Sequence, residues 1–354
     1  MTRPACSSDA DTEAYAYDLP RHLIAEHPLP ERDASRLLVV RRENGAPSPL
    51  EDRSFRDLPA YLDPGDALVI NDSRVFPARL VGRKPTGAAA EVLLVRPIDP
   101  AAYRWEALVR PGAKLKPGRV VEVAEGLAVR VEASREGGRT VCLETDEDPW
   151  AAIERHGRVP LPPYIRRDST TADRERYQTV YASRPGSVAA PTAGLHLTEA
   201  MLQTLRRAGV RLVPITLHVG PGTFRPVETP RLEEHRLEAE RYEVSQASAA
   251  ALNEARAAGG RVVAVGTTVV RVLESTIGED GMFEAGGGYT DLFIHPPFRF
   301  RAVDRLVTNF HLPRSTLLML VAAFAGRARV MEAYRHAVAR RYRFYSYGDA
   351  MLVT

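Results

Sequence analysis

Residues 261–271 have the sequence Arg-Val-Val-Ala-Val-Gly-Thr-Thr-Val-Val-Arg. The apolar run at 262–265 predicts a strand that is buried on both faces. Gly266 ends this strand, and Thr267 and Thr268 follow as candidate caps of a helix. A buried strand that runs directly into a helix is the unit from which α/β domains are built, so this stretch indicates the fold class.

The alternation of strands and helices extends along the chain in both directions. Helices are predicted to start after Thr198, Ser245 and Ser315, whose side chains can cap the first turn. Apolar runs at 37–40 and 68–70 predict two earlier strands. We therefore expect an α/β domain that contains residues from both ends of the chain.

Residues 76–149 interrupt this rhythm. Six short strand-like runs follow one another with Gly- and Pro-rich turns between them, which is typical of a small barrel or sandwich. We predict a discontinuous α/β catalytic domain of residues 15–75 and 150–354, with an all-β, barrel-like domain of residues 76–149 inserted into it. Residues 1–14 are expected to form a polar, frayed tail.

The composition and the apolar runs argue against a disordered, a membrane-spanning and a secreted, disulfide-rich protein. Of the 354 residues, 44% are hydrophobic and 26% are charged, which excludes global disorder. The longest apolar run, at 317–325, is far shorter than the roughly 20 residues of a membrane helix. The first residues contain no apolar segment of the kind found in secretory signals. Two cysteines, Cys6 and Cys142, cannot build a disulfide framework. We expect a cytoplasmic protein.

The basic residues are nearly all arginine and gather in two blocks. Lysine occurs only at positions 84, 114 and 116, and the formal net charge is +3. Residues 79–119 contain nine basic and three acidic residues, and residues 299–343 contain ten and two. Such blocks suit a surface that follows a phosphate backbone. Codon bias of the source genome is the favoured explanation of the arginine content, and a solvated face is the default interpretation of either block.

Polar loops follow several predicted strands, where α/β sheets usually bind ligands. An ordinary alternative exists for each loop: an Asx turn, a helix cap or a histidine in the core. The candidates are Asn71, Asp72 and Arg74 after the strand at 68–70, His196, the loop from His218 to Thr223 with Gly220 and Gly222, Thr267 and Thr268, and Asn309 to His311.

Other motifs are weaker or absent. Residues 342–349 interleave aromatic residues with arginine, as base-stacking surfaces do, although a packed terminal strand fits equally well. The histidines follow no metal-ligand spacing, and no G-x-S-x-G elbow or P-loop is present. We expect neither a metal nor a prosthetic group.

Eight stretches together resemble one family, the S-adenosylmethionine:tRNA ribosyltransferase-isomerases of queuosine biosynthesis. Between them, His235 and Glu240 also match the family. The chain departs from the family pattern at Leu237-Glu238, where Met-His is usual, and at His295 and Pro297. The matching stretches lie at 71–80, 161–165, 177–182, 188–196, 217–227, 265–271, 307–317 and 345–351.

The resemblance implies a fold and a reaction. Members of the family have an α/β domain interrupted by a β-barrel. They move the ribosyl portion of S-adenosylmethionine onto the aminomethyl group of a 7-deazaguanine in the tRNA anticodon and rearrange it to an epoxycyclopentane. The products are epoxyqueuosine-tRNA, adenine and methionine. S-adenosylmethionine is then a cosubstrate, tRNA is the partner, no membrane is involved, and we expect a monomer.

The reaction needs a base for the ribose C5′ proton that the sulfonium acidifies. We assign this base to His218 first and His311 second, and we include His235 and Asp72 in the catalytic set. Phe310 and Tyr345 are assigned to a cation–π contact with the sulfonium. The other residues assigned to the cosubstrate or modified base are Arg74, His196, Gly220, Gly222, Thr223, Thr267, Thr268, Arg271 and Asn309. Those assigned to tRNA phosphate are Lys114, Lys116, Arg340 and Arg343.

Two alternatives stay open from the sequence. An S-adenosylmethionine-dependent RNA methyltransferase would use the same cosubstrate, but such enzymes usually have a glycine-rich motif after the first strand, which is missing. A non-catalytic tRNA-binding module would explain the basic blocks but not the many polar loops at strand ends.

Overall fold

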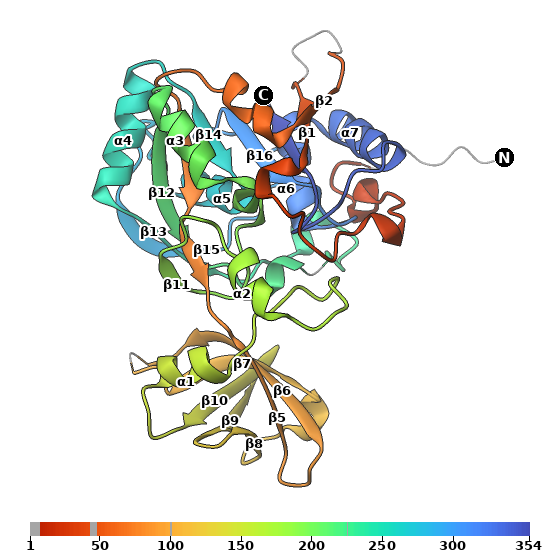
Figure 1. Ribbon diagram of the computed structural model, residues 1–354. Helices are drawn as coiled ribbons and strands as arrows, with labels where there is room; N and C mark the ends of the chain where they lie inside the picture. The colour runs from red at the N-terminus through yellow and green to blue at the C-terminus, as the bar shows by residue number, and fades with distance from the viewer. Residues whose placement is uncertain (1–7, 43–47, 100, 225) are drawn as a thin grey trace, which may run out of the picture.

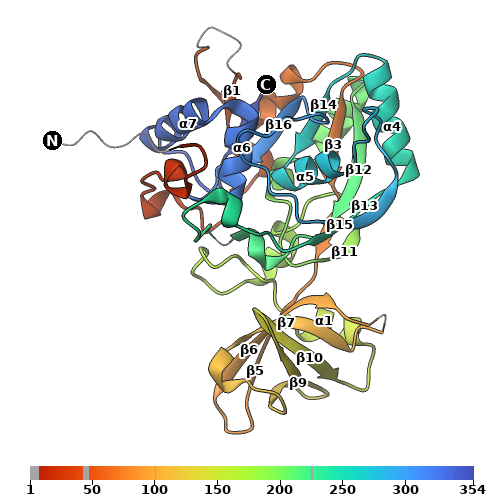
Figure 2. The ribbon, with the colours of Figure 1, turned by 180° about the vertical axis from the view of Figure 1, so that it is seen from behind.

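The computed structural model describes residues 8–42, 48–99, 101–224 and 226–354, and shows a larger α/β body joined to a separate β-barrel (Figures 1 and 2). The chain enters the barrel at strand β5 and leaves it after strand β10 and helix α1. The predicted fold class, an α/β protein with an all-β barrel built into it, is confirmed.

A nine-stranded sheet forms the centre of the larger body, in the order β15-β13-β12-β3-β14-β16-β17-β1-β2. Strands β12, β3, β14 and β16 are parallel neighbours, so their carboxyl ends lie at one edge of the sheet. The strands are β1 (Arg36–Val40), β2 (Glu51–Ser54), β3 (Ala67–Asn71), β12 (Arg211–Leu217), β13 (Glu240–Val244), β14 (Val262–Val265), β15 (Gly286–Thr290), β16 (Arg305–Asn309) and β17 (Ala350–Val353).

Both faces of this sheet are covered, which explains why its central strands are continuous apolar runs. Val69 and Ile215 pack with the core residues of helices α4 to α7, whereas Leu68 and Val263 pack on the other face against helix α3. The α-helices are α1 (Pro149–His156), α2 (Thr171–Arg176), α3 (Glu199–Arg207), α4 (Gln246–Ala257), α5 (Thr267–Thr276), α6 (Thr316–Ala325) and α7 (Arg327–Ala339).

Three of the predicted helix caps are confirmed and one is wrong. The hydroxyls of Thr198, Ser245 and Ser315 accept hydrogen bonds from the first turns of α3, α4 and α6. Helix α5 instead has Gly266 as its N-cap, with φ of 100°, and Thr267 is its first helical residue. Only glycine adopts this backbone conformation readily, so the turn from β14 into α5 depends on Gly266.

The barrel is closed, in the order β10-β7-β6-β5-β8-β9. Its interior holds Trp105, which is fully buried, together with alternate apolar residues of each strand. A Cβ atom on Gly82 would lie 2.2 Å from the carbonyl oxygen of Glu122, so closure between β5 and β8 requires glycine there. The strands are β5 (Arg79–Arg83), β6 (Ala89–Pro97), β7 (Arg104–Arg110), β8 (Val120–Ala124), β9 (Leu127–Arg135) and β10 (Gly138–Glu144).

Short elements complete the fold. Strands β4 (Ser73–Val75) and β11 (Arg184–Ser187) form a parallel pair beside the sheet. The 3₁₀ helices are η1 (Thr12–Tyr15), η2 (Arg21–Leu23), η3 (Arg32–Ala34), η4 (Phe55–Tyr61), η5 (Gly112–Lys114), η6 (Thr192–His196), η7 (Pro221–Phe224) and η8 (Leu232–Glu234).

Residues 8–14 differ from the expected frayed tail. The Thr12 amide donates to the carbonyl of Pro230, and the Thr12 hydroxyl donates to the carbonyl of Thr229. Ala14 is buried in the main core. Contacts with a loop more than 200 positions away hold this segment, and the local sequence contains no sign of them.

Candidate active site

Polar residues gather at the edge where the four parallel strands end. Asp72 follows β3, His218 follows β12, Gly266 follows β14, and Asn309 is the last residue of β16. This is the edge at which open α/β sheets bind ligands. It is also the edge from which the chain runs into the barrel, because β4 and β5 follow directly after β3.

Asn71 joins the ends of β3 and β12, and both polar atoms of its side chain already make hydrogen bonds within the protein. Its Nδ2 donates to the carbonyl of Leu217, and its Oδ1 accepts from the amides of Leu217 and Ser73. The side chain is fully buried. Asn71 therefore ties the end of β3 to the end of β12 and sets the positions of Asp72 and His218.

Asp72 and His218 form the first polar group of the site. The Asp72 carboxylate accepts from the hydroxyl of Thr216 at 2.6 Å and from the hydroxyl of Ser183 at 3.0 Å. The alternative pairing of Asp72 with Arg74 is not seen among the described contacts; Arg74 is exposed. An oriented carboxylate beside an imidazole can stabilise the protonated form of that imidazole during proton transfer.

The imidazole of His218 is half-buried, and its Nδ1 has no hydrogen-bond partner among the described residues. Burial is the main cause of its lowered pKa, the positive charge of Arg241 adds to the effect, and Asp72 and Glu243 oppose it. The ring lies against Gly186, where a Cβ atom would be 3.0 Å from Nδ1. His218 is thus a neutral base at pH 7 with an unoccupied nitrogen.

Glu240 and Arg271 form a second, buried group. The Glu240 carboxylate accepts from the Gly220 amide at 2.8 Å and pairs with Arg271. Arg271 also donates to the carbonyls of Leu292 and Thr290. All three guanidinium nitrogens are therefore engaged, and this pair positions the Gly220 loop. The assignment of Arg271 to the substrate stays a prediction.

The start of helix α5 offers a third set of groups. Thr267 and Thr268 are buried, with 5% and 7% of their surfaces exposed. The first amides of a helix have no intrahelical acceptor and point outward from its N-terminus. Their assignment to the cosubstrate stays a prediction.

His196 and His311 are buried and hydrogen-bonded to neighbouring side chains. The Nδ1 of His196 bonds to the Ser35 hydroxyl at 2.7 Å, and its Nε2 bonds to Asn309 at 3.1 Å. The Nε2 of His311 bonds to the Thr308 hydroxyl at 2.8 Å. Burial lowers the pKa of each ring to about 3. Both rings are enclosed in this structure, and the assignments of His196 to the substrate and of His311 as the second candidate base stay predictions.

The two aromatic candidates have different surroundings. Phe310 is fully buried among Tyr334, Tyr342 and Phe344, and its assignment to a contact with the sulfonium stays a prediction. Tyr345 stacks on Tyr164 with ring centroids 4.4 Å apart. Its φ of 72° is unusual for a non-glycine residue, and its hydroxyl is buried without a described partner. The role of Tyr345 stays a prediction, as does that of Asn309, whose Oδ1 is also unpaired.

Three further candidates lie on the loop that precedes β13 or on the Gly220 loop. His235 is half-buried and packs edge-on against Phe293, and burial lowers its pKa. A Cβ atom on Gly222 would lie 3.4 Å from the carboxylate of Glu238. The side chain of Thr223 lies outside the described residues, so its assignment stays a prediction.

Of the four residues assigned to tRNA phosphate, three are exposed and one is half-buried. Lys114, Lys116 and Arg340 are exposed. Arg343 is half-buried, because its guanidinium donates to the carbonyl of His27. Burial also lowers the Arg343 pKa. Arg343 therefore holds the loop at residue 27 and is less available to a phosphate than the other three.

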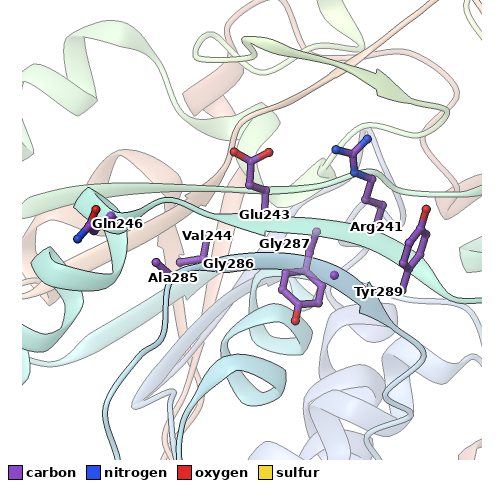
Figure 3. Close-up of a pocket in the computed structure, with 10 residues that line it drawn as sticks. Arg241, Glu243, Val244, Gln246, Ala285, Gly286, Gly287 and Tyr289 are labelled. Carbon is purple, nitrogen blue, oxygen red and sulfur yellow. The ribbon is translucent and has the colours of Figure 1, made fainter. Parts of the chain in front are cut away.

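A groove that was not predicted from the sequence runs along β13 and β15 (Figure 3). Its volume is about 640 Å³, and its lining includes Arg241, Glu243, Tyr289 and the glycines at 286–288. The run Gly286-Gly-Gly-Tyr289 is the signal that could have pointed to it, because glycines leave a strand surface open.

Comparisons with known proteins agree with this architecture. Residues 12–353 match the family model described as queuosine biosynthesis protein. The chain belongs to this family. A protein of Anaeromyxobacter sp. (strain Fw109-5), named S-adenosylmethionine:tRNA ribosyltransferase-isomerase, is 56% identical over 96% of this chain and 97% of its own length. A relative with the same name from Pelotomaculum thermopropionicum is 53% identical over 96% of this chain and 98% of its own length.

A solved structure is also similar. The crystal structure of an S-adenosylmethionine tRNA ribosyltransferase from Thermotoga maritima matches 98% of this chain and 100% of its own, with 41% identity and a TM-score of 0.55. In this member of the queuosine biosynthesis family, the described residues contain no helix long and apolar enough to cross a membrane. They also contain no group of three or more His, Cys, Asp or Glu arranged to hold a metal ion.

The two buried histidines predict a loss of stability in mild acid. Unfolded histidine has a pKa near 6.5, whereas His196 and His311 remain neutral in the fold down to about pH 3. Between these values the unfolded chain binds protons that the folded chain does not. Stability is therefore full above pH 6.5 and falls as the pH drops, by about 2 kcal/mol for each histidine at pH 5.

Urea unfolding at pH 7 and pH 5 measures this effect. His311→Gln is expected to reduce the pH dependence of the free energy of unfolding by about half, whatever its effect at pH 7. His22 is exposed, so His22→Ala should leave the pH dependence unchanged. Equal unfolding free energies at pH 7 and pH 5 for the unmodified chain would contradict the prediction.

Proposed function

We propose that this protein is an S-adenosylmethionine:tRNA ribosyltransferase-isomerase. It transfers and isomerises the ribosyl portion of S-adenosylmethionine onto 7-aminomethyl-7-deazaguanine in a tRNA anticodon, with release of adenine and methionine. The observation that carries the proposal is the full-length match to relatives with this name. The neutral, half-buried His218 at the carboxyl edge of the sheet is consistent with the chemistry that the reaction needs.

The residues of the site suit particular steps. The sulfonium acidifies the ribose C5′ proton, and the neutral imidazole of His218 takes that proton, with Asp72 nearby to stabilise the imidazolium. The neutral amine of the tRNA base then bonds to a ribose carbon as the ring C–O bond opens and adenine leaves. The carbon that lost its proton closes the five-membered carbon ring on the anomeric carbon, whose oxygen becomes an oxyanion. A ribose oxyanion finally displaces methionine and closes the epoxide, which requires that oxygen to be held in line. We assign Thr267 and Thr268, at the start of α5, to the ribose hydroxyls.

The cell location and assembly follow from this proposal. A tRNA-modifying enzyme acts in the cytoplasm, and we propose that it does so as a monomer with residues 76–149 as an inserted domain. S-adenosylmethionine is a cosubstrate, and no resident cofactor is part of the proposal.

A product assay tests the function. The protein is mixed with S-adenosylmethionine and tRNA that carries 7-aminomethyl-7-deazaguanine, and adenine, methionine and S-adenosylhomocysteine are followed by mass spectrometry. Adenine and methionine in equal amounts, with a heavier nucleoside in the digested tRNA, support the proposal. S-adenosylhomocysteine would indicate a methyltransferase, and tRNA binding without a product would indicate a binding module.

The exposed lysines of the barrel predict a specific salt dependence. Each phosphate contact contributes about 0.7–0.9 to the slope of log K against log salt. The double variant Lys114→Ala/Lys116→Ala is therefore expected to reduce the slope for tRNA binding by about 1.5. Arg207→Ala removes an exposed charge on helix α3 and should leave the slope unchanged. An unchanged slope in the double lysine variant would remove these residues from the tRNA surface.

A further inference from the structure

The groove along β13 and β15 continues the row of side chains that begins at His218. The amide of His218 donates to the carbonyl of Arg241, which extends the pairing of β12 with β13 by one residue. Arg241 in turn pairs with Tyr289 on β15. Residues directly opposite each other in an antiparallel pair point to the same face. His218, Arg241 and Tyr289 therefore form one row, and Tyr289 lies two strand spacings, about 10 Å, from His218.

At the end of this row farthest from His218, the exposed ring of Tyr289 lies beside the exposed guanidinium of Arg241. Tyr289 has the largest exposed fraction, 60%, of the exposed large hydrophobic residues. Arg241 is also exposed and has no ion pair or side-chain hydrogen bond among the described residues. Figure 3 shows Arg241, Glu243 and Tyr289 projecting from the same side of the two strands. An aromatic ring next to arginine is the combination that holds unstacked bases and their phosphates.

The space between these side chains suits a flat ring. Glu243 pairs with Gly287, which has no side chain, so the surface beside the Tyr289 ring is open down to the backbone. The exposed Glu243 carboxylate stands at the border of this space. It would repel a phosphate but can accept hydrogen bonds from the N–H groups on the edge of a base. The opposite charges of Glu243 and Arg241 therefore favour one orientation of a bound nucleotide, with its base near Glu243 and its phosphate near Arg241.

One side chain of the barrel lies close to Tyr289. Arg96 of β6 has a raised pKa, caused mainly by its hydrogen bonds to Glu106 and to a smaller extent by Tyr289. The phenol of Tyr289 therefore lies close to a second guanidinium, which belongs to the barrel. A strand of RNA that reaches His218 between the two bodies would pass both arginines.

We propose that this groove binds a single unstacked nucleotide of the tRNA, adjacent to the nucleotide that reacts at His218. The base stacks on Tyr289 over Gly287, its N–H edge donates to Glu243, and its phosphate pairs with Arg241. The inference rests on the proposed function for the identity of the RNA, but not for the location of the groove. A peptide strand added to the open edge of β15 is the alternative outcome.

Binding of a synthetic anticodon stem-loop RNA, measured by fluorescence anisotropy, tests the inference without turnover. Tyr289→Ala is expected to raise the Kd by roughly 5- to 100-fold, because one stacked base is lost. Tyr289→Phe keeps the ring and should bind within about twofold of the unmodified protein. Arg241→Ala is expected to weaken binding and to reduce the salt slope by about 1.

The matched control is Met282→Ala, which removes an apolar side chain, 48% exposed, from the turn before β15. It should leave the Kd unchanged. In the product assay, Tyr289→Ala should raise the KM for tRNA and leave the KM for S-adenosylmethionine unchanged. An unchanged Kd in Tyr289→Ala would overturn the inference, and a change of oligomeric state alone would indicate a protein contact at β15. Failure of the proposed function would instead appear as a lack of adenine and methionine with the unmodified protein.

Discussion

His218→Ala is expected to lower kcat for adenine release by about 10²- to 10⁴-fold, the usual contribution of a positioned general base. The imidazole is the one near Asp72 with an unoccupied, buried Nδ1, and its lowered pKa keeps it neutral at pH 7. Binding of S-adenosylmethionine should change little, because the Gly220 loop and helix α5 do not depend on this ring. Single-turnover adenine release and equilibrium binding of S-adenosylmethionine measure the two effects separately.

The dependence of kcat/KM on pH is a second measurement that tests the role of His218 as the base. Because the His218 pKa is lowered from 6.5, kcat/KM should fall only below that pH, as the base becomes protonated. His218→Ala should lose this acidic limb together with most of the activity. His22→Ala removes an exposed histidine from η2 and serves as the control, with both rate and profile unchanged. Near-normal turnover in His218→Ala would exclude it as the base.

Residues next to predicted strands were placed correctly because strand ends can be inferred from local pattern. The apolar run at 68–70 ends where β3 ends, so Asp72 falls at the sheet edge, and the same argument holds for His218 after β12. Both predictions need only the rule that parallel strands end together. The caps at Thr198, Ser245 and Ser315 were also predictable, since a cap and its helix are neighbours in the sequence.

Residues that depend on distant contacts could not be placed in this way. His196 is buried because η6 packs it between Ser35 and Asn309, more than 100 positions away in either direction. The row from His218 to Tyr289 depends on the register of β13 and β15, which is set by pairing between short, polar strands. A one-residue shift would place these side chains on the opposite face, so no local pattern decides it.

The Glu240–Arg271 pair is the second site at which a large effect is expected. Glu240→Gln keeps an oxygen that can accept from the Gly220 amide but removes the negative charge beside the buried guanidinium of Arg271. Breaking a buried pair in this way typically costs about 3–5 kcal/mol, because the remaining charge is neither hydrated nor neutralised. We expect the thermal unfolding midpoint to fall by roughly 5–15 °C.

A double-mutant cycle measures how much of the loss of stability comes from the interaction between the two charges. Glu240→Gln/Arg271→Met removes both charges, so its cost should be clearly smaller than the sum of the two single variants. The carbonyls of Thr290 and Leu292 lose their donor in any Arg271 variant, and this cost is common to both sides of the cycle. Glu254→Gln breaks the exposed pair with Arg211 and is the control, with an expected cost of about 0–1 kcal/mol. Additive effects of the two single variants would show that the charges do not interact, and the assignment of this pair as the anchor of the Gly220 loop would be lost.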